Sequence, residues 1–340
     1  MTSFKKRTEK FWDWFQANVD SLNKEMKDKN KVFERIRREL NKVFISIPFL
    51  IGGNDGENEI TLSPEGSSNL YFLSRFWKEQ SPQIAGWSFF DYKRPNMDMD
   101  FAISVNAASI QIAKDDMFFH PVLDTENKRI NVQIYCEEIR SVADDVKMTY
   151  TFLMLDECLG EGRTETAIGE IGIADEKTPE MLPFTELHAY IQKTFEDNEW
   201  NLFETPIELF AGYQLQPQEV KNKYRKDVYV GYTCHIDLIN SNLQGKDGAI
   251  KYMRSVGAEY IFITYDNTGI PNDEKVNHRA TIEDRLISLL DAHRLGYHIG
   301  GATGIYKSYI DLLVLDIGEF RKEINKASKD FGVKMKVIPF

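Results

Sequence analysis

The sequence is poor in the features that mark secreted, disulfide-bonded or membrane proteins. Its 340 residues include three cysteines, Cys136, Cys158 and Cys234, and none has a neighbour at the spacing of a metal site. Scattered single cysteines are typical of reduced thiols in a cytoplasm. No stretch approaches the ~20 apolar residues needed to span a bilayer, and the N-terminus lacks the apolar segment of a signal peptide. We therefore expect a cytoplasmic protein with no membrane partner.

Recognisable catalytic motifs are also absent. The six histidines are scattered, with no HExxH and no GxSxG motif. Cys234 and His235 are adjacent, so a strand would point their side chains to opposite faces and separate a nucleophile from its base. The acids of "LDECLGEGRTE", which include Asp156 and Glu161, could approach one another near a helix end. Without matching histidines they are interpreted as a solvated face. The sequence thus predicts no catalytic residue, no metal and no cofactor.

Positively charged residues are also few relative to acidic ones. Lys and Arg number 42 against 53 Asp and Glu, which gives a formal net charge of -11. Because nonspecific nucleic-acid binding requires clustered cations against the phosphate backbone, this balance argues against a nucleic-acid partner. What the chain does have is 42% hydrophobic and 12% aromatic residues. That composition and length suit a globular protein of two or three domains.

Glycine gathers in one stretch, "GGATGIYKS" at residues 300–308, whose lysine raises the question of a phosphate-binding loop. A Walker loop needs glycine directly before the lysine and a helix after it. Here Tyr306 precedes Lys307, and the pattern that follows is that of a strand. Glycines at a strand end relieve steric limits in a turn or bulge. The stretch is therefore predicted to form a β-hairpin that binds no nucleotide.

Apolar periodicity divides the chain into helices and strands. Two helical stripes come first: Phe11, Phe15, Val19, Leu22 and Met26, then Val32, Ile36, Leu40 and Phe44. Strands are predicted at 48–53, 58–64, 86–92, 100–112, 129–136 and 166–175, with helices at 68–80 and 144–160. We expect an N-terminal α+β domain over 1–180, a proline-containing connector with short helices over 181–226, and a ferredoxin-like α+β domain over 227–340.

The C-terminal region has the clearest pattern. Strands are predicted at 258–266, 297–304, 308–316 and 333–340, and helices at 280–295 and 318–331, each helix followed by a glycine. This order is β-α-β-β-α-β, that of a ferredoxin-like unit. The sequence therefore predicts a four-stranded antiparallel sheet over 259–340 with two helices on one face.

Residues 259–340 also carry a set of residues that resembles a bacterial domain of unknown function, the one numbered 695. The pattern comprises Asn267, Gly269 and Pro271 in a turn, Ile282, Glu283 and Asp284 on a helix, and Gly301, Thr303 and Gly304 before a strand. Such domains are similar to the regulator of ribonuclease E activity, an acidic ferredoxin-like protein that inhibits by binding. The resemblance covers about a quarter of the chain. It implies a ferredoxin-like fold and a role in binding, with no catalytic residue.

Together these features favour a bacterial protein that regulates or inhibits another protein by binding it, without catalysis. The alternative is an enzyme or small-ligand-binding protein with a site in an interdomain cleft. Five acids in or just after the predicted turn are the candidate protein contact: Asp266, Asp273, Glu274, Glu283 and Asp284. A loop at one end of the sheet would present them together, and their charge would steer a basic partner. Their other possible role is solubility and charge balance at the helix N-terminus.

Overall fold

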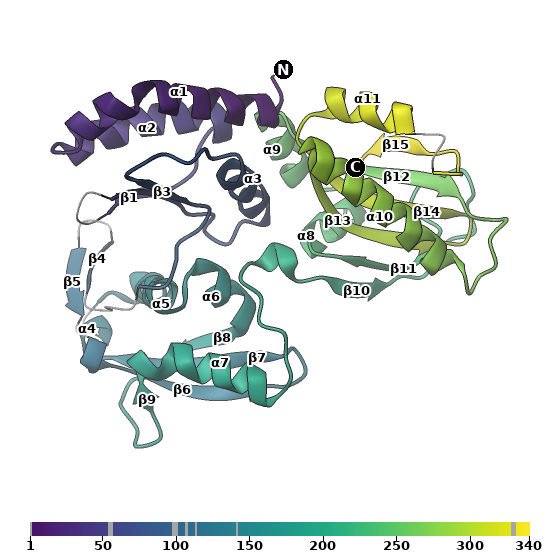
Figure 1. The fold of residues 1–340 in the computed structure, drawn as a ribbon. Coiled ribbons are helices and arrows are strands. Elements are labelled where there is room, and N and C mark those ends of the chain that lie inside the picture. The colour runs from purple at the N-terminus through teal and green to yellow at the C-terminus, as the bar shows by residue number, and fades with distance from the viewer. Residues whose placement is uncertain are drawn as a thin grey trace. The chain divides into compact units, whose positions relative to one another are not determined.

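The structure is a computed structural model that describes residues 2–53, 57–96, 101–105, 108–112, 114–140, 142–327 and 331–340. It is a mixed α+β fold with antiparallel sheets, as the sequence predicts (Figure 1). The chain divides into two compact units. Unit 1 comprises Met1–Ile47, Ser68–Trp87 and Phe210–Phe340, and unit 2 comprises Pro48–Ser67 and Ser88–Leu209.

This division differs from the predicted one, in which residues 1–180 form a single domain. The N-terminal helices belong with the C-terminal sheet. The backbone N–H of Phe4 donates to the Gly257 carbonyl at 3.0 Å, and that of Lys5 donates to the Leu315 carbonyl at 3.1 Å. Local periodicity identifies elements but not their distant packing partners, so it predicts continuous domains where the structure has interleaved ones.

Unit 1 is built on one sheet surrounded by helices. Its helices are α1 (Phe4–Glu25), α2 (Lys29–Phe44), α3 (Ser68–Glu79), α8 (Ile236–Leu243), α9 (Gly248–Val256), α10 (Lys275–His293) and α11 (Ile317–Ala327). Its strands are β10 (Ala211–Gln214), β11 (Val228–Thr233), β12 (Glu259–Asp266), β13 (Gly296–Gly304), β14 (Lys307–Val314) and β15 (Lys336–Pro339).

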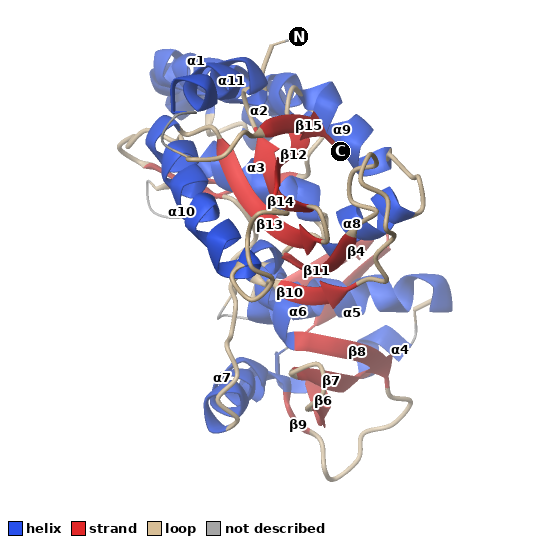
Figure 2. Cartoon of the chain, turned by 90° about the vertical axis from the view of Figure 1, so that its right-hand side faces the viewer, coloured by secondary structure: helices blue, strands red, loops and turns tan. Residues whose placement is uncertain are grey.

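The six strands of unit 1 form an antiparallel sheet in the order β10-β11-β13-β14-β12-β15. All four strands predicted within 259–340 are present, and β11 and β10 extend the sheet beyond β13. Figure 2 shows the strands from β15 to β10 with α10 along one side. Helices α10 and α11 pack on one face through apolar residues that include Ile282, Leu286 and Phe320. The other face carries a smaller cluster around Phe262 and Tyr309.

Helices α1 and α2 form an antiparallel hairpin from the two predicted stripes. Ser3 and Asp28 cap their N-termini, with side-chain oxygens that accept the N–H of Lys6 and Lys31. The stripe residues buried in the structure are Phe11, Phe15, Leu22, Val32, Ile36, Leu40 and Phe44. The amphipathic period therefore predicted this pair of helices correctly.

Unit 2 contains three further sheets. Its helices are α4 (Glu137–Arg140), α5 (Asp144–Leu159), α6 (Glu161–Ala167) and α7 (Leu187–Asp197). Its strands are β1 (Phe49–Gly52), β2 (Asn58–Leu62), β3 (Trp87–Phe90, whose first residue belongs to unit 1), β4 (Phe101–Val105), β5 (Ala108–Ile112), β6 (Met117–Asp124), β7 (Arg129–Cys136), β8 (Ile168–Ile173) and β9 (Leu182–Pro183). In the main core, Phe119 of β6 and Val132 of β7 pack with Tyr150 and Met154 of α5 and with Ile191 of α7.

Two features of unit 2 differ from the sequence prediction. Strand β6 was not predicted. Pro121 in its middle cannot donate to a ladder, yet the structure places Pro121 opposite Val132 of β7. The predicted strand at 100–112 is two strands, β4 and β5, and residues 100, 106 and 107 lie outside the described residues. Within the described ranges, every helix is too short or too polar to cross a bilayer.

Candidate functional site

The five predicted contact acids separate into two groups. Asp266, Asp273, Glu274 and Asp284 are exposed, on the β12–α10 connection and the first half of α10. Glu283 is buried, so its carboxylate is not available to a protein partner. Asp266 accepts hydrogen bonds from the N–H and the hydroxyl of Thr268, and these hydrogen bonds lower its pKa. The sequence pattern could not tell the buried acid from the four exposed ones.

Glu283 belongs to a buried polar cluster between α10 and the sheet. Its carboxylate lies 2.9 Å from the Arg279 guanidinium and accepts a hydrogen bond from the Tyr232 hydroxyl at 3.0 Å. Arg279 also donates to the Thr303 hydroxyl at 2.8 Å. Burial, with help from the Glu283 carboxylate, raises the pKa of Tyr232 well above its ordinary value. The hydroxyl therefore stays protonated and acts as a hydrogen-bond donor inside the fold.

Two residues of the pattern that resembles the bacterial domain, Asn267 and Gly301, lie in closely packed positions. Asn267 is fully buried and donates to the Gly304 carbonyl and the Ser308 hydroxyl, both at 3.1 Å, which ties the β12–α10 turn to the β13–β14 hairpin. Gly301 faces α10 so closely that a Cβ there would lie 2.2 Å from a Glu283 oxygen. At these two positions the fold uses a buried amide and a missing side chain.

The glycine stretch forms the predicted hairpin. In the pairing of β13 with β14, Gly296 lies opposite Val314 at one end and Thr303 lies opposite Ser308 at the other. The turn at 305–306 leads directly into β14. One carboxylate oxygen of buried Asp227 accepts the N–H groups of Tyr306 and Lys307 at 3.0 Å each. No helix begins after the lysine, so the stretch lacks the helix N-terminus that a phosphate loop uses.

A second buried ion pair lies on the opposite face of the sheet. Arg225 donates to both carboxylate oxygens of Asp311, at 2.5 and 3.2 Å, and to the Tyr213 hydroxyl at 3.1 Å. Its guanidinium also lies 4.9 Å from the centre of the Phe340 ring. All of these contacts satisfy a buried charge and fasten the connection before β11 onto the sheet.

Glu161 of "LDECLGEGRTE" does not lie on the solvated face that the sequence indicated. Glu161 is 2% exposed and accepts hydrogen bonds from the Ser63 hydroxyl at 3.2 Å, from the Lys93 N–H at 3.4 Å and from the Glu65 N–H. Burial raises the pKa of Glu161 to about 7 and that of Asp156 to about 6. Glu161 therefore fastens two loops to α6. Because its partners are distant in the sequence, the local pattern around Glu161 looks like that of an exposed segment.

The cysteines and the buried histidine are positioned for packing. All three cysteines are free and buried, and burial raises the pKa of Cys136 to about 12. His235 lies 3.2 Å from the Asn69 side chain, and burial lowers its pKa to about 4. A thiol with so high a pKa is a weak nucleophile near pH 7, and an imidazole with so low a pKa is a weak base.

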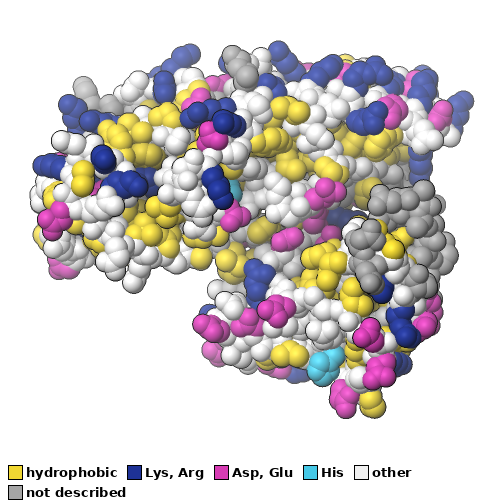
Figure 3. Space-filling view, turned by 180° about the vertical axis from the view of Figure 1, so that it is seen from behind, with side chains coloured by type: hydrophobic (Ala, Val, Ile, Leu, Met, Phe, Trp, Pro, Cys, Tyr) yellow, Lys and Arg dark blue, Asp and Glu magenta, His cyan; other side chains and the backbone are white. Residues whose placement is uncertain are grey.

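The N-terminal hairpin, residues 1–47, is the basic part of an acidic chain. It holds twelve Lys and Arg against seven Asp and Glu, whereas the whole chain holds 42 against 53. Figure 3 shows Lys and Arg side chains gathered along the upper edge of the view, over α1 and α2. The exposed cations are Lys6, Lys10, Lys24, Lys27, Lys29, Lys31, Arg37, Arg38 and Lys42.

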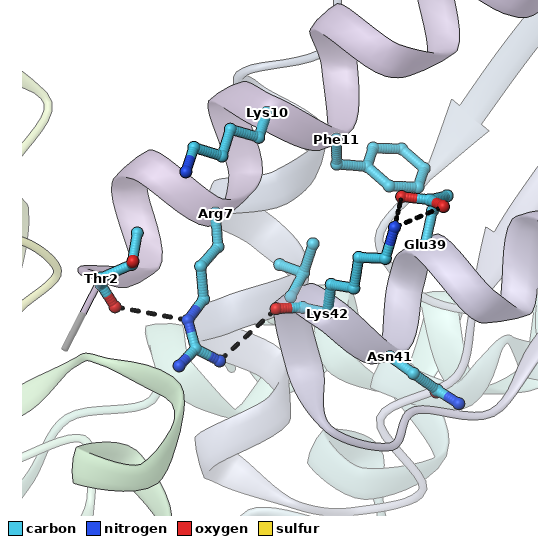
Figure 4. Close-up of a pocket in the computed structure, with 8 residues that line it drawn as sticks. Thr2, Arg7, Lys10, Phe11, Glu39, Asn41 and Lys42 are labelled. Carbon is cyan, nitrogen blue, oxygen red and sulfur yellow. Dashed lines mark hydrogen bonds and ion pairs between the residues drawn. The ribbon is translucent and has the colours of Figure 1, made fainter.

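A pocket of about 460 Å³ opens on this hairpin (Figure 4). It is lined by Thr2, Arg7, Lys10, Phe11, Glu39, Asn41, Lys42 and Val43. Arg7 reaches across from α1 and donates to the carbonyl oxygens of Thr2, Lys42 and Ser255 at 3.3, 3.4 and 3.3 Å. Lys42 pairs with Glu39 at 2.6 Å. The pocket thus has a fixed guanidinium at its centre and flexible amino groups beside it.

Sequence reasoning missed this pocket because the net charge of the whole chain conceals the local excess. A charge count over the two predicted helices alone would have revealed the local excess of Lys and Arg. Phe11 was visible only as a member of an apolar stripe, and Val43 was not singled out. Their shared position beside Arg7 and Lys10 depends on how the two helices pack.

No group of three or more His, Cys, Asp and Glu side chains suited to a metal ion occurs among the described residues. Comparisons with known proteins found no matching family model, curated protein or solved structure.

Proposed function

We propose that this chain is a protein-binding regulator or inhibitor that acts without catalysis. The observation that carries the proposal is the distribution of charge on unit 1. Exposed acids stand on the β12–α10 connection, whereas exposed cations surround a pocket on the α1–α2 hairpin. Buried Arg225 pairs with Asp311 and buried Arg279 pairs with Glu283, so these four charges are not available for recognition. Oppositely charged patches give specificity and faster encounter with complementary partners.

The fold of residues 259–340 supports this proposal. The strand order β13-β14-β12-β15, with α10 and α11 on one face, is that expected of a ferredoxin-like unit. We assign the unit on that basis, together with the resemblance to the bacterial domain of unknown function. A cytoplasmic location in a bacterium belongs to the same assignment. A similar fold alone does not define an activity, so the proposed function depends on the binding surfaces.

The test is affinity capture of the intact chain from a lysate of its host, followed by mass spectrometry. The variant Asp273→Lys/Glu274→Lys reverses two exposed acids on the connection before α10. The matched control, Glu259→Lys/Asp291→Lys, makes the same charge change at the opposite ends of β12 and α10. We expect a salt-sensitive partner that the first variant loses and the control keeps. If both variants retain the same partners with the same salt sensitivity, the acidic end takes no part in binding.

A small anionic ligand is the second candidate, and the volume of the hairpin pocket favours it. Pockets of about 300–1,000 Å³ are typical of small-molecule sites, and this one measures about 460 Å³ with three cations in its lining. Isothermal titration with phosphate and citrate distinguishes the two candidates. A dissociation constant below about 100 μM for either ion would favour the small ligand.

A further inference from the structure

The six-stranded sheet of unit 1 ends in two edge strands that differ in their protection. Strand β15 carries Pro339, which has no N–H to offer, and an exposed Lys336, and both residue types discourage the addition of a further strand. Strand β10 lies at the opposite edge of the sheet (Figure 2). Its segment 211–216, AGYQLQ, contains neither a charged residue nor a proline. This edge therefore lacks the usual devices that prevent strand addition.

The outer backbone groups of this segment are open to solvent. The N–H of Leu215 donates to the Tyr229 carbonyl at 3.1 Å, which shows which residues of the segment bond to β11. Because hydrogen-bonded residues alternate along an antiparallel strand, Gly212, Gln214 and Gln216 point their backbone groups away from β11. All three residues are exposed, and no backbone hydrogen bond to another described residue involves their outer groups. These groups can therefore pair with a seventh strand.

The side chains beside this edge are already held in position. Arg225 donates to the Tyr213 hydroxyl at 3.1 Å, and both Tyr213 and Leu215 pack against the smaller apolar cluster of the sheet. A pocket of about 390 Å³ opens on the same two strands, and its lining consists of residues 214–216 and 229–230. An arriving strand therefore meets an edge whose side chains the fold has positioned in advance.

The segment is complementary to a second copy of itself. If two segments run antiparallel about a twofold axis at Gln214, each Gln216 lies opposite Gly212 of the other copy. The long amide then faces a residue without a side chain, and the two Gln214 amides, each a donor and an acceptor, meet at the axis. On the other face Tyr213 lies opposite Leu215 of the other copy, an aromatic–aliphatic pair of the kind that stabilises antiparallel strands. The contact also brings no like charges together.

We infer that two copies of this chain associate edge to edge through β10, so that their six-stranded sheets become one continuous sheet. The same patch serves on both sides of a twofold interface, so one contact satisfies the outer backbone groups of both copies. A strand pair of this length buries less than the ~1,200 Å² typical of stable complexes, so we expect a dissociation constant on the order of 10–100 μM. This dimer goes beyond the proposed function, because it uses neither the acidic connection before α10 nor the pocket on the α1–α2 hairpin.

The test is sedimentation equilibrium of the full chain over about 5–300 μM, a range that spans the expected constant. The variants are Gln214→Lys and Gln214→Glu, measured singly and as an equimolar mixture. The matched controls, Gln16→Lys and Gln16→Glu, make the same charge changes at an exposed glutamine of α1. Circular dichroism shows whether each variant keeps the secondary structure of the parent.

We expect the parent to dimerise and each Gln214 variant alone to dimerise at least about tenfold more weakly, because like charges then face each other at the axis. The equimolar mixture should recover most of this loss, since opposite charges then meet across the axis. Both Gln16 variants should match the parent within about twofold. Raising the salt from about 50 to 300 mM should leave the parent dimer as strong or strengthen it, because the contact is uncharged and salt screens the repulsion between two acidic chains.

Three results would overturn the inference. One is a parent chain that stays monomeric over the whole concentration range, and this result depends on no variant. Another is equal dimerisation of the parent and the single Gln214 variants. The third is a mixture that associates no better than either variant alone. The lysate capture with Asp273→Lys/Glu274→Lys tests a different surface, so failure of the dimer and failure of the proposed function are separate results.

Discussion

Replacing Glu161 with Gln should change the pH dependence of stability in a direction set by its burial. Burial raises the pKa of this carboxyl from an ordinary 4.5 to about 7 in the folded chain. Between these values the folded state holds a proton that the unfolded state has lost. The contribution of Glu161 to the free energy of unfolding therefore falls as the pH rises from about 5 to 7 and is constant above that range.

The size of the effect follows from the two pKa values. At ~1.4 kcal/mol for each pKa unit, ionisation of Glu161 lowers the free energy of unfolding by about 3 kcal/mol at pH 8 and about 1 kcal/mol at pH 5. Glutamine removes this loss but has only one acceptor oxygen. The N–H groups of Glu65 and Lys93 donate to different oxygens of Glu161, so one of them loses its partner at a cost of about 1–2 kcal/mol.

We therefore expect Glu161→Gln to be more stable than the parent by about 1–2 kcal/mol at pH 8 and no more stable at pH 5. The assay is urea unfolding from pH 5 to pH 8, followed by circular dichroism. Because two units can unfold separately, hydrogen exchange should show the change in unit 2. The control is Glu170→Gln, which removes an exposed carboxylate from the neighbouring strand β8. A difference between Glu161→Gln and the parent that is the same at both pH values would refute the reasoning.

Two further changes test the polar contacts of the sheet. Asp311→Ala should lower the free energy of unfolding by about 3–5 kcal/mol, because it leaves the charge of Arg225 buried and unpaired. The double variant Arg225→Met/Asp311→Leu should recover most of that loss in urea unfolding, and failure to recover it would show that the pair itself is essential. Gly301→Ala should destabilise by about 1–3 kcal/mol, since the added Cβ would lie 2.2 Å from a Glu283 oxygen. Gly269→Ala, where nothing lies within 4 Å, is the control, and equal melting temperatures for the two alanine variants would contradict the packing argument.

Much of the secondary structure could be predicted because it depends on neighbouring residues. The stripe from Ile282 to Leu290 repeats at the helical period, and α10 forms with Ile282, Leu286 and Leu290 buried. The order of glycines and β-branched residues around Tyr306 likewise predicted the β13–β14 hairpin. These elements require no knowledge of distant contacts.

The contacts that define the candidate sites depend on residues far apart in the chain. Arg225 meets Asp311 across 86 positions, and Ser63 meets Glu161 across 98. No local pattern reveals either pair, so the carboxylate of Glu161 looked the same in the sequence as that of an exposed acid. The hairpin pocket is closer to prediction, because Arg7 and Lys42 lie on two helices that the sequence identified. Its existence still required the packing of one helix on the other.

The interleaved order of unit 1 has a consequence for the order in which the chain folds. Helices α1, α2 and α3 emerge early from the ribosome and can pack together, since Trp12 and Trp77 lie with ring centres 4.6 Å apart. The sheet that supports them follows only after residue 210.

Synthesis of the roughly 160 residues between Ile47 and Phe210 takes roughly 10 to 30 s at ~5–20 residues per second. During that time the backbone N–H of Phe4 lacks its partner in the finished protein, the Gly257 carbonyl, because that residue has not been synthesised. Unit 2 is complete by Leu209, so it can fold while the first helices wait. A nascent chain stopped at that point should therefore contain a folded insertion and a helical segment that still needs a chaperone or its own C-terminal half.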